Sequence, residues 1–228
     1  MTRIICFDIE TTGLDYKNGD RCIEIGAVEL LDGKLTGNNF HEYVNPEGKI
    51  IPAESYMVHK ISNAFLEDKP TMAVVAPKFL EYIGDSPVVA HNGLEFDFPF
   101  MNWELDKLKL PNIPREQMLD SMVIARNRVY GPKSNTLDSL AKWFGISLAT
   151  RADAHGALID AEILAHVYQE LENTAPVKDI HEIMDEQHAA FLKTPKIGND
   201  FPKRTFPIPE DELKIHDEFM DKLLNPQK

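Results

Sequence analysis

An almost unbroken apolar run near the N-terminus ends abruptly in two acidic residues. The run spans residues 3–10 and closes with Asp8 and Glu10, which are separated only by Ile9. An apolar stretch without alternation is typical of a strand that is buried on both faces of a sheet. Residues two positions apart on a strand point to the same face. The sequence therefore predicts two carboxylates side by side at the end of a central strand.

Two interpretations of this acid pair remain open from the pair alone. Neighbouring carboxylates repel each other, and burying them without a partner is costly. A divalent cation bound between Asp8 and Glu10 would remove that cost, because such cations prefer oxygen ligands. Alternatively, the strand simply reaches solvent at this point.

Strand-like and helix-like segments follow in an order that indicates a mixed sheet flanked by helices. Patterning predicts strands at 21–31, 39–44 and 88–90, with a hairpin turn at Asp32 and Gly33, and helices at 71–83 (capped by Thr71), from 94, from 137 (capped by Asn135 or Thr136) and at 156–173. Pro77 should kink the helix at 71–83, because proline removes a backbone donor.

Two later clusters add two carboxylates and a histidine. Asp97 lies among aromatic residues after the predicted strand 88–90, although it would also suit a helix start, where the macrodipole favours an acid. His155 and Asp160 are five positions apart, so on one continuous helix they would occupy different faces. If His155 precedes the helix and Asp160 lies within it, both can approach one site. Otherwise His155 is an ordinary surface residue.

The charge balance limits how the chain can bind nucleic acid. It has 24 basic and 37 acidic residues, a net charge of −13, whereas most non-specific DNA-binding proteins present basic patches. A protein that grips only a strand end can meet the phosphates with bound divalent cations instead. The composition therefore disfavours tight binding to long duplexes.

Other features indicate a cytoplasmic protein without a membrane partner. No apolar run approaches the ~20 residues that a membrane helix needs, and residues 1–10 lack the pattern of a secretory signal. Cys6 and Cys22 have no metal-binding or redox spacing, so we expect reduced thiols in the core.

Taken together, the motifs at 7–13, 91–97 and 155–160 resemble those of the DEDDh 3′–5′ exonuclease family. Similar stretches occur at 58–61, 65–71 and 135–140, and the likeness covers about residues 3–170. It implies an α/β fold with a ribonuclease-H-like mixed five-stranded sheet, flanked by helices and followed by a C-terminal extension.

The resemblance also implies a role for each site residue. Asp8, Glu10, Asp97 and Asp160 would bind two divalent metal ions, Mg²⁺ or Mn²⁺, and His155 would act as general base. Binding of the terminal nucleotide would fall to Thr11, Thr12, Glu54, Val58, His59 and Phe96. Thr12 and Val58 are equally consistent with ordinary turn or core residues.

Within the family, the chain is most similar to proofreading subunits of bacterial replicative DNA polymerases. This similarity implies an exonuclease domain at 1–173, a linker with a possible helix at 174–209, and a short acidic helical tail at 210–228 that docks on the polymerase catalytic subunit. Residues 187–191 resemble a sliding-clamp peptide, but they also suit an ordinary helix face. The substrate would be a single-stranded or frayed 3′ DNA end.

Two alternatives remain open from the sequence. Three residues separate Asn92 from Phe96, one more than we expect of the polymerase subunits, and this spacing resembles that of stand-alone repair exonucleases. A free DNA-repair or RNA-trimming exonuclease is therefore the first alternative. The second is an inactive nucleic-acid-binding module, which would have no need to gather mutually repelling acids.

Overall fold

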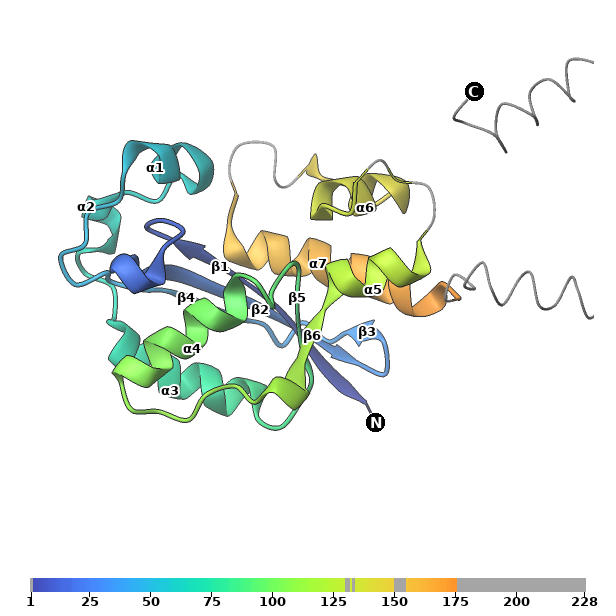
Figure 1. Ribbon diagram of the computed structural model, residues 1–228, viewed down its shortest axis with the longest axis horizontal. Helices are drawn as coiled ribbons and strands as arrows, with labels where there is room; N and C mark the ends of the chain where they lie inside the picture. The colour runs from blue at the N-terminus through green and yellow to red at the C-terminus, as the bar shows by residue number, and fades with distance from the viewer. Residues whose placement is uncertain (1, 130–131, 133, 150–154, 176–228) are drawn as a thin grey trace, which may run out of the picture. The chain divides into compact units, whose positions relative to one another are not determined.

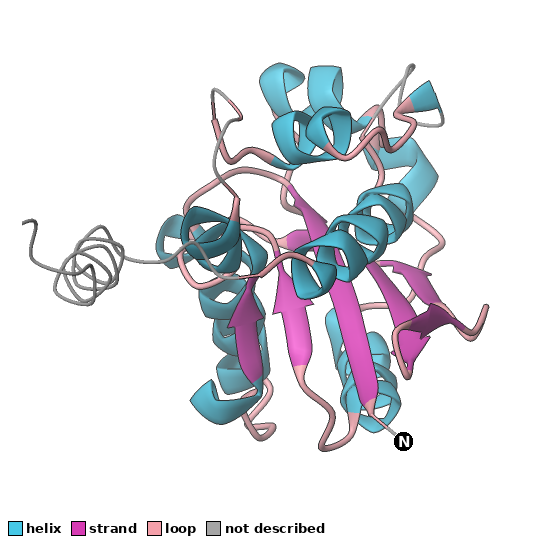
Figure 2. Cartoon of the chain, turned by 90° about the vertical axis from the view of Figure 1, so that its right-hand side faces the viewer, coloured by secondary structure: helices cyan, strands magenta, loops and turns pink. Residues whose placement is uncertain are grey.

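The computed structural model describes residues 2–129, 132, 134–149 and 155–175, which form a sheet with helices on both faces (Figures 1 and 2). The strands are β1 (Arg3–Thr11), β2 (Cys22–Leu31), β3 (Lys34–Leu35), β4 (Phe40–Tyr43), β5 (Val88–Ala90) and β6 (Met118–Asp120). Their order is β3-β2-β1-β5-β6, and β4 also pairs with β2. β1 runs antiparallel to β2 and parallel to β5, so the predicted mixed sheet is confirmed.

Among the described residues, the sheet has six strands where five were expected. The additional strand is the short β3, which follows β2 after the turn at Asp32 and Gly33. Both turn residues have positive φ, 49° and 74°. A two-residue turn of this kind matches the twist of a hairpin and brings Lys34 opposite Leu31.

Helices cover both faces of the sheet (Figure 1). They are α1 (Ala53–His59), α2 (Asn63–Leu66), α3 (Met72–Ile83), α4 (Asp97–Lys107), α5 (Ser121–Arg128), α6 (Leu137–Trp143) and α7 (Ala157–Asn173), with short 3₁₀ turns η1 (Tyr16–Asn18) and η2 (Arg115–Gln117). One face packs against α3 and α4, where the Phe7 ring lies 5.6 Å from Phe79 and 5.3 Å from Phe98. The opposite face packs against α5, α6 and α7.

Alternation along β1 sends its acidic residues toward α7. Ile5, Phe7 and Ile9 join the core under α3 and α4, whereas Cys6 joins the core under α7. Side chains two apart share a face, so Asp8 and Glu10 continue the Cys6 side. The strand therefore delivers its acid pair to the sheet face that α7 covers.

The structure differs from the helix predictions in two details. Thr71 is the N-cap residue of α3, as predicted, but its side chain makes no capping hydrogen bond within the described chain. The helix expected from 94 begins at Asp97. Thr136 does cap α6, because its side chain accepts a hydrogen bond from the Ser139 amide.

Several elements were not predicted, and some predictions fall outside the described part of the chain. α1, α2, α5, β6 and the short β3 had no counterpart in the sequence patterns. The proposed linker helix, the clamp-like peptide and the acidic tail all lie beyond residue 175, outside the described residues. Within the part that the structure describes, no helix is long and apolar enough to cross a membrane.

Candidate active site

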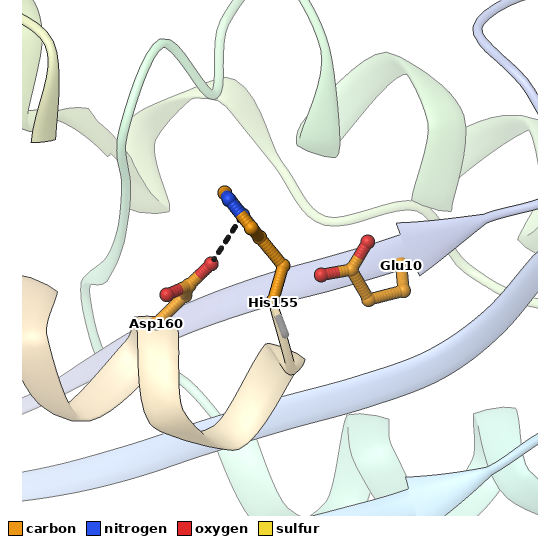
Figure 3. A group of neighbouring side chains, drawn as sticks. All are labelled: Glu10, His155 and Asp160. Atoms are coloured by element: carbon orange, nitrogen blue, oxygen red, sulfur yellow. Dashed lines mark ion pairs between the residues drawn. The ribbon is translucent and has the colours of Figure 1, made fainter. Parts of the chain in front are cut away.

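Three of the predicted catalytic residues meet above the end of β1 (Figure 3). Glu10, His155 and Asp160 each offer a ligand atom, and these atoms all lie within 4.8 Å of one another. The His155 Nδ1 atom is 3.3 Å from the Asp160 Oδ2 atom. Two residues from the third motif thus join one from the first, as the sequence predicted.

The start of α7 explains how His155 and Asp160 converge. His155 precedes the helix, and Asp160 lies in its first turn with its amide donating to the Gly156 carbonyl at 2.9 Å. Asp160 is buried, whereas the His155 side chain is 43% exposed. The backbone amide of His155 donates to the Val58 carbonyl at 3.2 Å, which ties this loop to α1. The predicted arrangement of loop and helix is therefore the one observed.

Asp8 lies outside this trio but next to the start of α7. It pairs in register with Gly26 of β2. A Cβ atom at Gly26 would lie only 2.2 Å from the Leu158 amide nitrogen and 2.3 Å from the Ala157 carbonyl carbon. Because Gly26 has no side chain, the first turn of α7 rests directly on the β2 backbone beside Asp8.

Asp97 also lies outside the trio, but it is joined to the strand that carries the acid pair. It is the first residue of α4, is only 3% exposed, and hydrogen-bonds the backbone of Ile9, between Asp8 and Glu10. The pKa of the Asp97 carboxyl is raised to about 7, because burial raises it most and the charge of Asp120 adds to the rise, while the backbone hydrogen bonds oppose it. A carboxylate so costly to ionise fits a site that a cation completes.

Asp120 braces the loop that leads to Asp97. Its carboxylate accepts hydrogen bonds from the amides of Asn92 at 3.2 Å and Leu94 at 3.1 Å. It also caps α5 by accepting from the Met122 amide at 2.9 Å. The sequence analysis missed Asp120. The available signal was its position directly before α5, where an aspartate commonly caps a helix.

Another anchor that the sequence did not reveal holds α4 against β2. Glu104 is 1% exposed, and its Oε1 atom accepts from Arg21 Nε at 2.8 Å and from the Cys22 amide at 3.3 Å. Asp97 lies two turns earlier on the same helix. The beginning of β2 therefore fixes the helix that presents Asp97.

The predicted nucleotide-binding residues differ widely in exposure. Glu54 and Val58 are exposed, Phe96 is half-buried, and Thr11, Thr12 and His59 are buried. The Thr12 hydroxyl donates to Asp20 at 3.2 Å and accepts from the Arg21 amide at 3.0 Å, as an ordinary turn residue would.

His59 presents a polar atom that suits a ligand. Its Nδ1 accepts from the Ile61 amide at 3.0 Å, so the neutral ring carries its proton on Nε2. That atom is buried and has no hydrogen-bond partner among the described residues. Burial lowers the pKa of His59, which favours the neutral ring, although the nearby Glu24 charge opposes this effect.

Comparison with known proteins agrees with this geometry. A sequence model of the exonuclease family matches residues 5–168. The chain belongs to the exonuclease family. The match includes all three motifs, from the acid pair of β1 to the first turn of α7.

Named proteins are similar in sequence to most of this chain. The DNA polymerase III subunit epsilon of Rickettsia felis is 40% identical over 228 residues, 97% of each chain. The protein of the same name from Escherichia coli K12 is 43% identical over 176 residues, which cover 74% of this chain and 70% of that one. Among solved structures, Exonuclease X in complex with 5′ overhanging duplex DNA has a TM-score of 0.56 and 30% identity, covering 76% of this chain and 92% of that one.

Proposed function

We propose that this protein is a 3′–5′ exodeoxyribonuclease that proofreads as the epsilon subunit of a DNA polymerase III. The observation that carries the proposal is the convergence of Glu10, His155 and Asp160 within 4.8 Å. It occurs in a chain that is 40% identical, over 97% of its length, to a protein named DNA polymerase III subunit epsilon. Asp8 and Asp97 adjoin the same strand end and complete the set of acids.

The donor set fits divalent cations. Asp8, Glu10, Asp97 and Asp160 offer carboxylate oxygens, which Mg²⁺ and Mn²⁺ prefer. The buried Asp97 carboxyl, with its pKa raised to about 7, would ionise more easily beside a cation. When bound, two such ions supply the positive charge that stabilises the attacking and leaving oxygens of an in-line displacement.

His155 would handle the proton of the attacking water. Its Nδ1 faces Asp160, so Nε2 is the ring atom that takes the proton. The water oxygen bonds to the phosphorus, the bond from phosphorus to the 3′ oxygen breaks, and that oxygen gains a proton from solvent. The products are a nucleoside 5′-monophosphate and a strand shortened by one nucleotide with a 3′ hydroxyl.

The terminal nucleotide would bind against α1. Val58 and Glu54 face solvent on this helix, and the His59 Nε2 proton is available for a sugar or phosphate oxygen. Phe96 offers a half-buried ring for base packing, and Thr11 lies at the end of β1. Thr12 would contribute through the turn that its side chain holds.

Residues 174–228 would tether the enzyme to the polymerase. We assign 1–173 to catalysis, 174–209 to a linker, and 210–228 to docking on the polymerase catalytic subunit. The similarity to the Rickettsia felis protein covers 97% of this chain and so includes most of this region. An acidic exonuclease with a weak grip on DNA gains from tethering, because linkage replaces affinity with effective concentration.

The test compares the wild-type chain with Asp8→Ala on a 5′-labelled DNA primer bearing a 3′ mismatch, and on an RNA oligomer of the same sequence. We expect only the wild type to shorten DNA from its 3′ end, only with Mg²⁺ or Mn²⁺, and to release 5′-monophosphates. Activity that survives chelator, or that persists in Asp8→Ala, would contradict the proposal.

A free-standing exonuclease is the second candidate, because the Asn92–Phe96 spacing favours it and Exonuclease X is similar over 92% of its length. Two measurements separate the candidates. If the chain is a polymerase subunit, it captures the polymerase catalytic subunit in a pull-down. Replacing two apolar residues of the proposed docking tail, Leu213→Glu with Leu223→Glu, abolishes this capture. A free enzyme retains none, and an RNA-trimming enzyme cuts the RNA oligomer faster than DNA.

A further inference from the structure

Glu24 is a buried carboxylate on β2 that contacts the helix carrying the third motif. It is only 2% exposed and pairs in register with Glu10 of β1. Its Oε2 atom accepts a hydrogen bond from the Ala157 amide at 3.1 Å, although the two residues are 133 positions apart. Ala157 is the first residue of α7, between His155 and Asp160.

The other oxygen of Glu24 is held from β4. His41 Nε2 lies 2.7 Å from Glu24 Oε1. Tyr43, opposite Glu24 in register, hydrogen-bonds the same carboxylate. The Glu24 side chain is thus held by residues of the sheet, and it can act as a rigid anchor for α7.

α7 needs an anchor of this kind at its N-terminus. The first amides of a helix have no partner inside the helix and are usually satisfied by a capping side chain. The N-cap residue of α7 is Gly156, which has no side chain to offer. Glu24 supplies an acceptor from another element, and its negative charge suits the positive end of the helix dipole.

The position of α7 determines the geometry of the catalytic trio. Asp160 lies three residues after Ala157 and His155 two residues before it, so movement of this turn shifts both relative to Glu10. Misplacement by 1 Å costs on the order of 100-fold in rate in well-organised active sites. A single hydrogen bond at this turn can therefore control the reaction without touching the substrate.

We propose that Glu24 is a positioning residue for the exonuclease reaction, which fixes the first turn of α7 and thereby sets the distances from His155 and Asp160 to Glu10. This inference rests on the proposed nuclease function for its kinetic consequence. Its structural part, the fixing of α7 by the Glu24 carboxylate, is measurable without any activity.

The conservative variant separates positioning from charge. In Glu24→Gln, the amide oxygen still accepts from Ala157 and the amide nitrogen faces His41, so kcat stays within ~3-fold of wild type. In Glu24→Ala the acceptor is lost, and kcat falls roughly 10- to 100-fold while KM changes less than about 2-fold. If Glu24 acted through its charge alone, Gln and Ala would lower kcat equally, and the positioning role would be excluded.

Amide hydrogen exchange of the metal-free, full-length protein tests the anchor directly. We expect Glu24→Ala to speed exchange at Ala157 and through the first turn of α7 by roughly tenfold or more, with little change near Leu171. The matched control is Glu29→Ala, which removes another partnered carboxylate on β2, the partly buried ion-pair partner of Arg3, away from α7. It should lower stability yet leave both kcat and exchange at Ala157 unchanged.

The possible outcomes decide two separate questions. Unchanged exchange at Ala157 in Glu24→Ala would overturn the anchor. A loss of kcat that Glu29→Ala reproduces would reduce Glu24 to a general stabilising role. If the wild type has no nuclease activity, the proposed function fails, while the exchange data still report whether Glu24 fixes α7.

Discussion

Replacing Gly26 by alanine should move α7 away from the sheet. An alanine Cβ would lie 2.2 Å from the Leu158 amide nitrogen and 2.4 Å from Leu158 Cα. Ordinary van der Waals contact begins at 3.4 Å, so the two backbones must separate by about 1.2 Å, the difference between 3.4 Å and 2.2 Å. Both contacting atoms belong to backbone, so no side-chain rotation can relieve the overlap.

This separation should affect stability and activity together. Overpacking of a tight contact typically costs about 1–3 kcal/mol in the free energy of unfolding. Because α7 carries Asp160 into the site, a shift of about 1 Å should lower kcat/KM on the order of 100-fold. Urea denaturation and steady-state digestion of a labelled DNA primer measure the two effects.

Gly156→Ala is the matched control for this substitution. A Cβ at Gly156 would have Ile159 Cδ1 as its nearest neighbour, at 3.8 Å, which is ordinary contact. The backbone φ there is −154°, an extended conformation that any residue adopts. The control should keep kcat/KM within about threefold of wild type. If Gly26→Ala does the same and loses less than ~0.5 kcal/mol, close packing of α7 on β2 does not set the site geometry.

Three further predictions concern the buried acids. Without metal, the pKa of Asp97 is about 7 in the folded protein, against an ordinary value of 3.8. Between these two pH values the folded chain keeps the proton and the unfolded chain loses it. The free energy of unfolding, relative to that of Asp97→Asn, should therefore fall by up to ~4 kcal/mol as pH rises from about 4 to 7. Urea denaturation in chelator at the two pH values measures this, and Mn²⁺ should stabilise the wild type most at the higher pH. Asp120→Ala strands the Asn92 and Leu94 amides and should cost about 2 kcal/mol or more in unfolding free energy; a loss below ~0.5 kcal/mol would contradict the brace. Glu104→Ala leaves the half-buried Arg21 guanidinium without its buried partner and should lower the free energy of unfolding by roughly 3 kcal/mol in the same assay. Glu47→Ala removes the other, exposed partner of Arg21 and should lower it by less than ~1 kcal/mol.

The parts of the site that could be predicted are those with a local signal. The apolar run that ends in Asp8 and Glu10 predicts a central strand, because burial on both faces leaves no alternation. Helix geometry states the condition under which His155 and Asp160 can meet: five positions do not share a helix face, so His155 must precede the helix that carries Asp160. Each of these inferences needs only neighbouring residues.

The parts that could not be predicted depend on contacts between distant segments. Glu24 reads as one acid within an apolar strand, and only the fold brings it to Ala157, 133 positions later. Asp120 likewise serves amides 28 and 26 positions earlier. The helix α1 lacks a side-chain cap because Pro52 precedes it, so its start carried no capping signal. Thr71 shows the opposite case, since it occupies the N-cap position of α3 but its side chain makes no capping hydrogen bond among the described residues.

The most direct test of the central claim is to locate the metal ions. Crystals of the wild-type protein soaked with Mn²⁺ and a nucleoside 5′-monophosphate would give anomalous peaks at the metal positions. We predict two peaks roughly 4 Å apart, ligated by Asp8, Glu10, Asp97 and Asp160, with His155 beside the phosphate. Peaks bound by other residues, or no peak at the end of β1 under saturating Mn²⁺, would contradict the account.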